Sequence, residues 1–413
     1  MNESVPCLPE LLAPAGDLRL MRTALTYGAD AVYLGGPELN LRAKARGVNR
    51  DELSLALQEA KSLGRKIYFC LNILPRQDQL QSVEACLDGL AAHPPDGLIL
   101  ADPGVLALAR KRIPGIPVHL STQANTGNAA AVRFWQEQGV SRVNLARELD
   151  LSEIRAIRRA MPTMELEVFV HGAMCMAISG RCLLSAYLNE RSANQGNCTH
   201  PCRFGYRPLS LTLEEYKRPG EPVWEVLEEE GFYSSILAAD DLCLVKYLAW
   251  FARQGLDALK IEGRMKTGSY LGVVTDVYAT ALQDLKAGDF RPGLYLKELG
   301  RTASRPLGTG FFLPGKRKRL FDPGKIVEDA PILGQIKGRA RGKVWEVRVK
   351  HRWRTEDCFQ ILVPGLKRPL IQAEQYALEK DNGQRVSEIH SGQTVFLGCD
   401  HPDLQAGLLL RRS

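Results

Sequence analysis

The sequence predicts an α/β protein: a (β/α)8, TIM-like barrel with a long cysteine-bearing insertion after its seventh strand, followed by a small C-terminal β-barrel-like domain. Two observations predict the barrel: eight short β-rich runs in the first 290 residues, and stretches of helical apolar spacing between most of them. A third predicts the second domain, because apolar residues after residue 325 recur every second position, as in antiparallel strands.

The eight runs are short, and a polar or glycine-marked turn follows each. Intervening segments of about 15 to 25 residues suit the crossovers that parallel strands require. An open, doubly wound sheet is the structural alternative, but the count of eight and the lack of a glycine-rich phosphate turn after the first run favour a closed barrel. The runs are Glu10–Gly16, Ala31–Gly36, Lys66–Asn72, Gly97–Asp102, Pro117–Gln123, Arg142–Glu148, Leu166–Gly172 and Ala258–Arg264.

The spacing of the last two runs divides the chain. The seventh and eighth runs lie 85 residues apart, so the segment 172–257 is an excursion from the barrel. We therefore expect a barrel over residues 1–290, a Gly-, Pro- and Lys/Arg-rich linker over 291–325, and a β-domain over 326–413. The N-terminus lacks the basic start and apolar run of a signal peptide, and no stretch approaches a membrane span, so a cytoplasmic location is expected.

The positive charge belongs to the C-terminal third. The whole chain has a net charge of +7, but residues 291–413 hold 23 basic and 13 acidic side chains, and the remaining residues hold 31 and 34. Basic side chains with Trp345, Trp353 and Phe359 between them are typical of surfaces that bind a phosphate backbone and stack on unpaired bases. A solvated basic surface without a ligand is the alternative.

Polar residues gather where the predicted strands end, which is the face on which barrel enzymes place their chemistry. His171, Lys260 and Glu262 are candidates for catalysis. Arg264 and Arg147 are cations suited to a dicarboxylate, because guanidinium groups bind carboxylates in pairs. Salt bridges across the barrel mouth are the structural alternative. The other candidates for substrate binding are Arg42, Asn72 and Gln123, with Lys316 and Arg317 for RNA.

Four of the ten cysteines lie within the excursion, in the spacing C-x6-C-x15-C-x3-C: Cys175, Cys182, Cys198 and Cys202. Four thiolates brought together hold one zinc ion or one iron–sulfur cluster. Zinc sites favour C-x2-C pairs, which are absent here, and disulfides do not suit a reducing compartment. An iron–sulfur cluster is therefore preferred over zinc.

Several motifs resemble peptidase family U32. They are EVFVHGAMC and SGRCLLS around Cys175 and Cys182, together with ELLAPAG, GADAVYLGG, LNLRAKARG, GNCTHPCRFGYR and LKIEGRMKTGSYLGVVTDVY. The resemblance covers nearly the whole chain. It implies an iron–sulfur protein of oxygen-independent hydroxylation, with Cys175, Cys182, Cys198 and Cys202 as ligands of a 4Fe–4S cluster.

The C-terminal β-domain resembles that of the family branch associated with forming 5-hydroxyuridine at the wobble position of tRNA, for which prephenate is the implied hydroxyl donor. Another branch hydroxylates a cytidine of 23S ribosomal RNA. The implied partners are tRNA or rRNA, a small anionic co-substrate, and proteins of electron transfer or cluster assembly; no membrane is implied. Proteolysis remains an alternative through a Cys175–His171 pair, although the sequence has no H-E-x-x-H or G-x-S-x-G motif. An RNA-binding protein without turnover is the third alternative.

Overall fold

The structure is a computed structural model. It describes residues 7–39, 46–175, 177–178, 182, 184–191, 193, 197–204, 239–313, 319–321 and 330–413.

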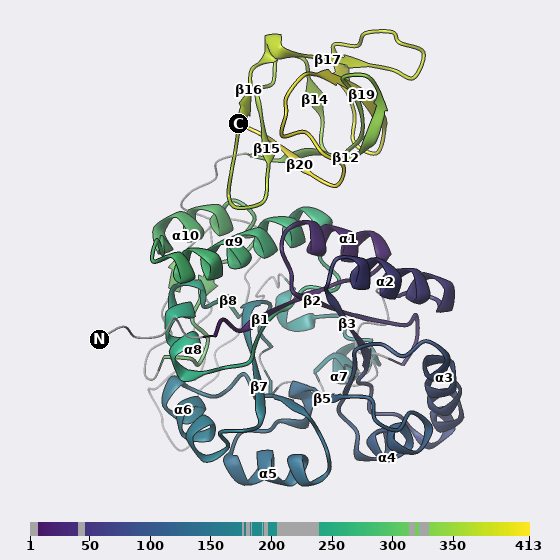
Figure 1. The fold of residues 1–413 in the computed structure, drawn as a ribbon, viewed down its shortest axis with the longest axis vertical. Coiled ribbons are helices and arrows are strands. Elements are labelled where there is room, and N and C mark those ends of the chain that lie inside the picture. The colour runs from purple at the N-terminus through teal and green to yellow at the C-terminus, as the bar shows by residue number, and fades with distance from the viewer. Residues whose placement is uncertain are drawn as a thin grey trace, which may run out of the picture.

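Eight parallel strands close into a barrel (Figure 1). The first strand pairs with the second and also with the last, and the last pairs with the seventh, so the sheet has no free edge between them. This closure confirms the predicted barrel and excludes the open doubly wound sheet. All eight runs predicted from the sequence contain one strand: β1 (Glu10–Pro14), β2 (Ala31–Gly35), β3 (Lys66–Leu71), β4 (Gly97–Leu100), β5 (Val118–Leu120), β6 (Arg142–Asn144), β7 (Glu165–Gly172) and β9 (Ala258–Ile261).

Helices surround the barrel, and polar side chains fix where most of them begin. Asp17, Asn49, Asp102 and Asp150 each accept a backbone N–H in the first turn of the helix that follows, which satisfies a donor that the helix itself leaves unpaired. The helices between the strands are α1 (Leu18–Thr26), α2 (Arg50–Ser62), α3 (Leu80–Ala92), α4 (Pro103–Arg112), α5 (Ala129–Glu137), α6 (Leu151–Ala160) and α8 (Leu248–Gln254), and α9 (Gly268–Ala287) follows the last strand.

Side chains along each strand point alternately outward and into the barrel, which produces two hydrophobic clusters. Side chains that point outward join the helices in one large apolar cluster, whereas Leu12, Ala31, Tyr33, Tyr68, Cys70 and Ile99 form a separate cluster. Buried polar side chains of the same inward series continue around the barrel: His119, Arg142, Asn144, Glu167 and Lys260. The barrel interior is therefore largely polar on the side formed by β5, β6, β7 and β9.

The excursion after β7 adds to the barrel where β7 ends. Strand β8 (Asp241–Cys243) runs antiparallel to the end of β7, and helix α7 (Leu184–Asn189) lies within the same connection. The residues assigned to a linker, 291–325, include regular structure: helix α10 (Pro292–Gly300) and strands β10 (Leu307–Gly308) and β11 (Arg319–Phe321), with β10 paired to β8. Their Gly and Pro content concealed the buried positions Tyr295 and Leu299, which anchor α10.

The C-terminal domain is a curled antiparallel sheet of seven strands in the order β16-β15-β20-β12-β13-β19-β17, with a separate β14–β18 pair. Two aromatic residues predicted to offer stacking faces, Trp353 and Phe359, are fully buried in its core instead, where their rings pack edge to face. The strands are β12 (Ile332–Arg341), β13 (Val344–Val349), β14 (Trp353–Arg354), β15 (Phe359–Leu362), β16 (Leu370–Ile371), β17 (Tyr376–Glu379), β18 (Glu388–Ile389), β19 (Thr394–Cys399) and β20 (Leu409–Arg412).

This β-domain lies against α1, α9 and α10 (Figure 1). Tyr27 at the end of α1 donates its hydroxyl hydrogen to the Leu362 carbonyl and accepts the backbone N–H of Leu409. Asp276 of α9 pairs with Arg368 at 2.7 Å. These buried polar contacts fix the β-domain on one side of the barrel. No helix among the described residues is long and apolar enough to cross a membrane.

Candidate active site at the barrel mouth

A narrow cavity of about 60 Å³ opens at the carboxyl ends of the barrel strands. Six of the residues predicted for the site lie together in its wall: Asn72, Gln123, Arg147, Lys260, Glu262 and Arg264. They come from β3, β5, β6 and β9 or from the residues directly after them, as the prediction from strand ends required. These six residues are three cations, one carboxylate and two amides.

Lys260 lies on the floor of this cavity, and Glu167 of β7 holds it. The Lys260 Nζ donates to Glu167 Oε1 at 2.8 Å and lies 4.5 Å from the centre of the Tyr33 ring. Asn144 Nδ2 donates to the same carboxylate oxygen at 2.8 Å. Glu167 and Lys260 are 1% and 3% exposed, so this ion pair is formed away from bulk water.

Below Glu167 the charges continue to the opposite end of the barrel. Arg142 lies 3.7 Å from Glu167 and 2.7 Å from both Glu10 and Glu165. Burial raises the pKa of Glu10, but the charge and hydrogen bond of Arg142 outweigh this and hold the pKa below its usual value. Glu10, Arg142, Glu167 and Lys260 therefore form an alternating series of charges along the barrel interior.

Arg147 joins the mouth to the excursion. Its Nη1 donates to the Ala173 carbonyl at 2.9 Å, its Nη2 lies 3.5 Å from Glu262, and its guanidinium covers the Phe169 ring at 3.7 Å. The pair with Glu262 is long, and Nε is buried without a hydrogen-bond partner in the part of the chain that the structure describes. A guanidinium held in this way keeps donor capacity for an anion that enters the mouth.

Two amides of the mouth, Gln123 and Asn144, are also incompletely satisfied among the described residues. Ser121 donates to Gln123 Oε1 at 3.2 Å and accepts from Asn72 at 3.5 Å. Gln123 Nε2 and Asn144 Oδ1 are buried without a partner among the described residues. Unpaired buried donors and acceptors are costly, and their presence in one cavity indicates a polar ligand.

Cys70 also faces the cavity, and burial raises its pKa, so its thiol stays protonated and unreactive at neutral pH.

His171, predicted as a catalytic residue, lies on the other face of β7. Its ring packs between Tyr270 and Tyr278 of α9, with the Tyr278 hydroxyl 3.4 Å from Nδ1, and it does not line the mouth. Burial, followed by the positive charge of Lys266, lowers its pKa to about 3. A register shift after Phe169 directs His171 toward the helices, which sequence alternation alone did not reveal.

Two glycines allow backbone segments around the mouth to pack closely against each other. A Cβ on Gly172, whose φ is +107°, would lie 2.6 Å from the Glu262 carbonyl oxygen, and one on Gly16 would lie 2.3 Å from the Arg264 carbonyl oxygen. Neither position admits a side chain without moving the backbone that carries Glu262 or Arg264.

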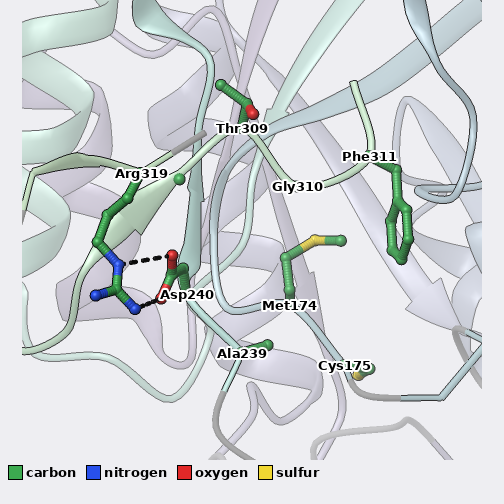
Figure 2. Close-up of a pocket in the computed structure, with 9 residues that line it drawn as sticks. Met174, Cys175, Ala239, Asp240, Thr309, Gly310, Phe311 and Arg319 are labelled. Carbon is green, nitrogen blue, oxygen red and sulfur yellow. Dashed lines mark hydrogen bonds and ion pairs between the residues drawn. The ribbon is translucent and has the colours of Figure 1, made fainter. Parts of the chain in front are cut away.

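A second cavity of about 450 Å³ lies beside the start of the excursion that carries the four predicted ligand cysteines, called the cysteine segment below (Figure 2). Met174 and Cys175 follow β7 into it, and Thr309, Gly310 and Phe311 form another wall. The Asp240–Arg319 ion pair, with contacts of 3.1 and 3.2 Å, closes one end. Arg147 lines the mouth and bonds the carbonyl of Ala173, the residue directly before Met174 in the wall of the second cavity.

No disulfide joins the four predicted cluster ligands, all of which belong to the described residues, and Cys175 is exposed. Ser185 of α7 fixes the segment of Cys198, since its hydroxyl accepts the Thr199 N–H at 3.0 Å. The His200 N–H in turn lies 3.4 Å from the Cys198 sulfur. Backbone N–H groups directed at sulfur are characteristic of iron–sulfur sites, so the donor set fits such a cluster in its chemistry. Among the described residues, no three His, Cys, Asp or Glu side chains gather around one metal position.

Three predicted substrate-binding residues, Arg42, Lys316 and Arg317, lie outside the described residues. The structure adds Tyr33, Asn144 and Phe169 to the mouth and Glu167 beneath it. Every second residue of a strand faces the barrel interior, and this rule applied to the predicted strands would have identified these residues. Glu167 and Phe169, for example, lie two residues apart on β7.

Comparison with known proteins agrees with the fold and the motifs. The profile of "Peptidase family U32" matches residues 16–321. The tRNA hydroxylation protein P of Escherichia coli is 37% identical over 86% of this chain and 86% of its own length. The protein of the same name from Helicobacter pylori is 39% identical over 95% of this chain and 96% of its own. The 23S rRNA 5-hydroxycytidine C2501 synthase of Escherichia coli is 34% identical over 75% of this chain but 43% of its own length.

The family profile begins just after β1 and covers the other seven strands of the barrel, the mouth residues and the four predicted ligand cysteines. The Helicobacter pylori relative extends the match through nearly all of the chain. The chain belongs to peptidase family U32.

Proposed function

We propose that this chain hydroxylates a pyrimidine base of RNA, most specifically uridine at the wobble position of tRNA, to give 5-hydroxyuridine. The observation that carries the proposal is the mouth itself, where Arg147, Lys260 and Arg264 surround incompletely bonded amides beside the cysteine segment. The relatives named for tRNA hydroxylation support the choice of RNA because they match the barrel and the β-domain together.

The hydroxyl donor that we propose is prephenate, a dicarboxylate. Its carboxylates would pair with the cations of the mouth, because guanidinium and ammonium groups buried beside low-dielectric walls bind anions strongly. A cavity of about 60 Å³ admits a carboxylate rather than a whole ring, so the reacting carbon of the donor would lie above the mouth.

Each mouth residue then has a separate task. Lys260, held by Glu167, anchors the anion. Glu262 orients the guanidinium of Arg147, and the free amide donor of Gln123 suits a carbonyl oxygen of the base. The target base must leave its stack to reach this site, as in other enzymes that modify bases.

We assign Cys175, Cys182, Cys198 and Cys202 to a 4Fe–4S cluster, which would supply one-electron chemistry beside the mouth when bound. The absence of a disulfide among these four cysteines and the N–H directed at the Cys198 sulfur support this assignment.

Peptidase activity, which the family name suggests, is not supported by the geometry. A cysteine peptidase needs its nucleophile hydrogen-bonded to a histidine. Cys175 lines the second cavity, whereas His171 packs between two tyrosines of α9, and no hydrogen bond joins them.

The test is mass spectrometry of nucleosides from tRNA and rRNA of cells that lack this gene. We expect 5-hydroxyuridine derivatives to disappear from tRNA and to return with the wild-type gene. Complementation with Lys260→Met or Cys182→Ala should fail, and the matched control Cys86→Ala, a partly buried thiol on α3, should succeed. Loss of a hydroxycytidine from rRNA instead would assign the alternative substrate. Unchanged nucleosides in both RNAs would overturn the proposal.

A further inference from the structure

Half of the cations in the described part of the β-domain are already paired, although the sequence alone presented them as one basic surface. Ion pairs within the domain or to the barrel engage Arg341, Lys343, Arg352, Arg354, Arg368, Arg411 and Arg412. Net charge therefore does not locate a binding surface here. The cations that lack a carboxylate partner are a better guide to where an anion binds.

Lys337, Arg348 and Lys350 are three such cations, on the β12–β13 hairpin or directly after it. Each is exposed, and none forms an ion pair among the described residues. Arg348 lies directly opposite Gln335 in the strand register, so the two side chains share a face of the sheet. Gln335 Nε2 donates to Thr23 of α1 at 3.2 Å, which shows that this face of the hairpin meets the barrel.

Helix α1 adds a fourth cation, Arg19, across the junction. Arg19, Arg22, Gln335 and Lys337 line a cleft of about 480 Å³ between the two domains. The Lys350 side chain reaches solvent, yet the desolvation it undergoes and the charges of Arg19, Lys337 and Arg348 lower its pKa.

Few carboxylates oppose this cluster. Arg22 is taken by Glu59 at 2.6 Å, but the contact of Arg19 with Asp17 is 4.0 Å long. Like charges held together by two domains are unfavourable unless an anion lies between them.

The cleft lies toward the mouth end of the barrel. Arg19 is in the first turn of α1, which begins just after β1 ends, and Gly16 between them packs against the Arg264 carbonyl in the wall of the mouth. A nucleic acid strand with one base in the mouth would therefore find phosphate-binding cations along α1 and the β12–β13 hairpin.

We propose that the cleft between α1 and the β12–β13 hairpin binds the phosphate backbone of the RNA substrate, through Arg19 and Lys337 in its wall and through Arg348 and Lys350 beside it. This inference rests on the proposed function, since it takes RNA as the substrate. It assigns the backbone contacts to the junction of the two domains rather than to the β-domain as a whole.

The test is equilibrium binding of tRNA, purified from cells lacking the gene, to the full chain at several salt concentrations. Lys337→Glu/Arg348→Glu is compared with Lys380→Glu/Arg385→Glu, an equal change of charge at two exposed cations of the same domain that lack ion pairs among the described residues. We expect the cleft variant to bind at least about tenfold more weakly in moderate salt, and its plot of log affinity against log salt to be shallower by about 1.4 to 1.8. The control should differ little from wild type.

Arg19→Glu changes the same cleft from the barrel side, and we expect it to weaken binding in the same direction. Equal affinities of the cleft and control variants, with circular dichroism showing both folded, would overturn the inference. Failure of the wild-type chain to prefer tRNA over duplex DNA would instead count against the proposed function, so the two failures are distinguishable.

Discussion

Lys260 and Glu167 form an ion pair of 2.8 Å inside the barrel, directly beneath the cavity at its mouth. The pair links the chemistry of the mouth to the charges below it, because the other oxygen of Glu167 faces Arg142 at 3.7 Å. A barrel interior is usually filled by branched apolar side chains. Here part of that filling has been replaced by charges, whose upper end, Lys260, is available to a ligand.

Removing the charge of Glu167 should lower the free energy of unfolding substantially. In Glu167→Gln the ammonium of Lys260 stays buried without a carboxylate, and we expect a loss of about 3 to 5 kcal/mol of unfolding free energy, measured by urea denaturation. The matched control is Glu165→Gln, which also removes a carboxylate bonded to Arg142 but at a side chain that is 47% exposed. We expect the control to lose less than about 1 kcal/mol. Equal losses would show that burial of the pair does not matter.

The strand runs and the strand-end residues were predictable because both follow from short-range pattern. Asn72, Gln123 and Arg147 come at or just after the ends of their strands, and parallel strands bring all such ends to one face. The closure of eight strands then placed residues far apart in the sequence, such as Asn72 and Lys260, around one cavity. Predicting this group of residues required no knowledge of contacts between individual side chains.

The remaining features depend on interactions that no local pattern encodes. The orientation of His171 follows from a register shift in β7, and α10 was hidden by the Gly and Pro content around it. Within the basic C-terminal third, a binding surface can be located only from ion pairs such as Arg368–Asp276. Pairing between the domains neutralises cations that the sequence alone counts as part of one basic surface. Long-range contacts of this kind are set by tertiary packing rather than by periodicity.

A second buried ion pair, Arg411 with Glu298, should anchor the β-domain to the barrel. Arg411 of β20 donates to both carboxylate oxygens of Glu298 in α10, at 2.7 and 2.9 Å, and both residues are less than 5% exposed. We expect Arg411→Ala to cost about 3 to 5 kcal/mol and to increase protease cleavage between the domains. Its neighbour provides the control: Arg412→Ala breaks a pair with Asp357 inside the β-domain, and we expect about 1 kcal/mol. Unchanged cleavage in Arg411→Ala would contradict the anchoring role.

The metal content of the chain distinguishes the two centres considered for its cysteines. Purified without oxygen, the protein should be brown and hold about four irons per chain. Cys182→Ala should lose both colour and iron, while the control Cys86→Ala keeps them. A colourless protein that holds one zinc ion would contradict the iron–sulfur assignment, because zinc has no visible charge-transfer band.

Acid should destabilise the fold through its buried histidines. Burial lowers the pKa of His171 to about 3 and lowers that of His119 well below its usual value. Below about pH 6.5 the unfolded chain binds protons that the folded chain does not, so stability falls as pH falls, by up to about 1.4 kcal/mol per pH unit for each histidine.

The measurement is urea unfolding at pH 7.5 and pH 5.5. His171→Gln removes one of these groups, and we expect the difference in unfolding free energy between the two pH values to shrink by up to about 1.4 kcal/mol. Comparison with wild type cancels the contributions of the carboxylates common to both proteins. His390→Gln, the same substitution at a largely exposed side chain, is the comparison variant. If His171→Gln and His390→Gln showed the same pH dependence as wild type, His171 would not be the group that stays neutral in the folded chain.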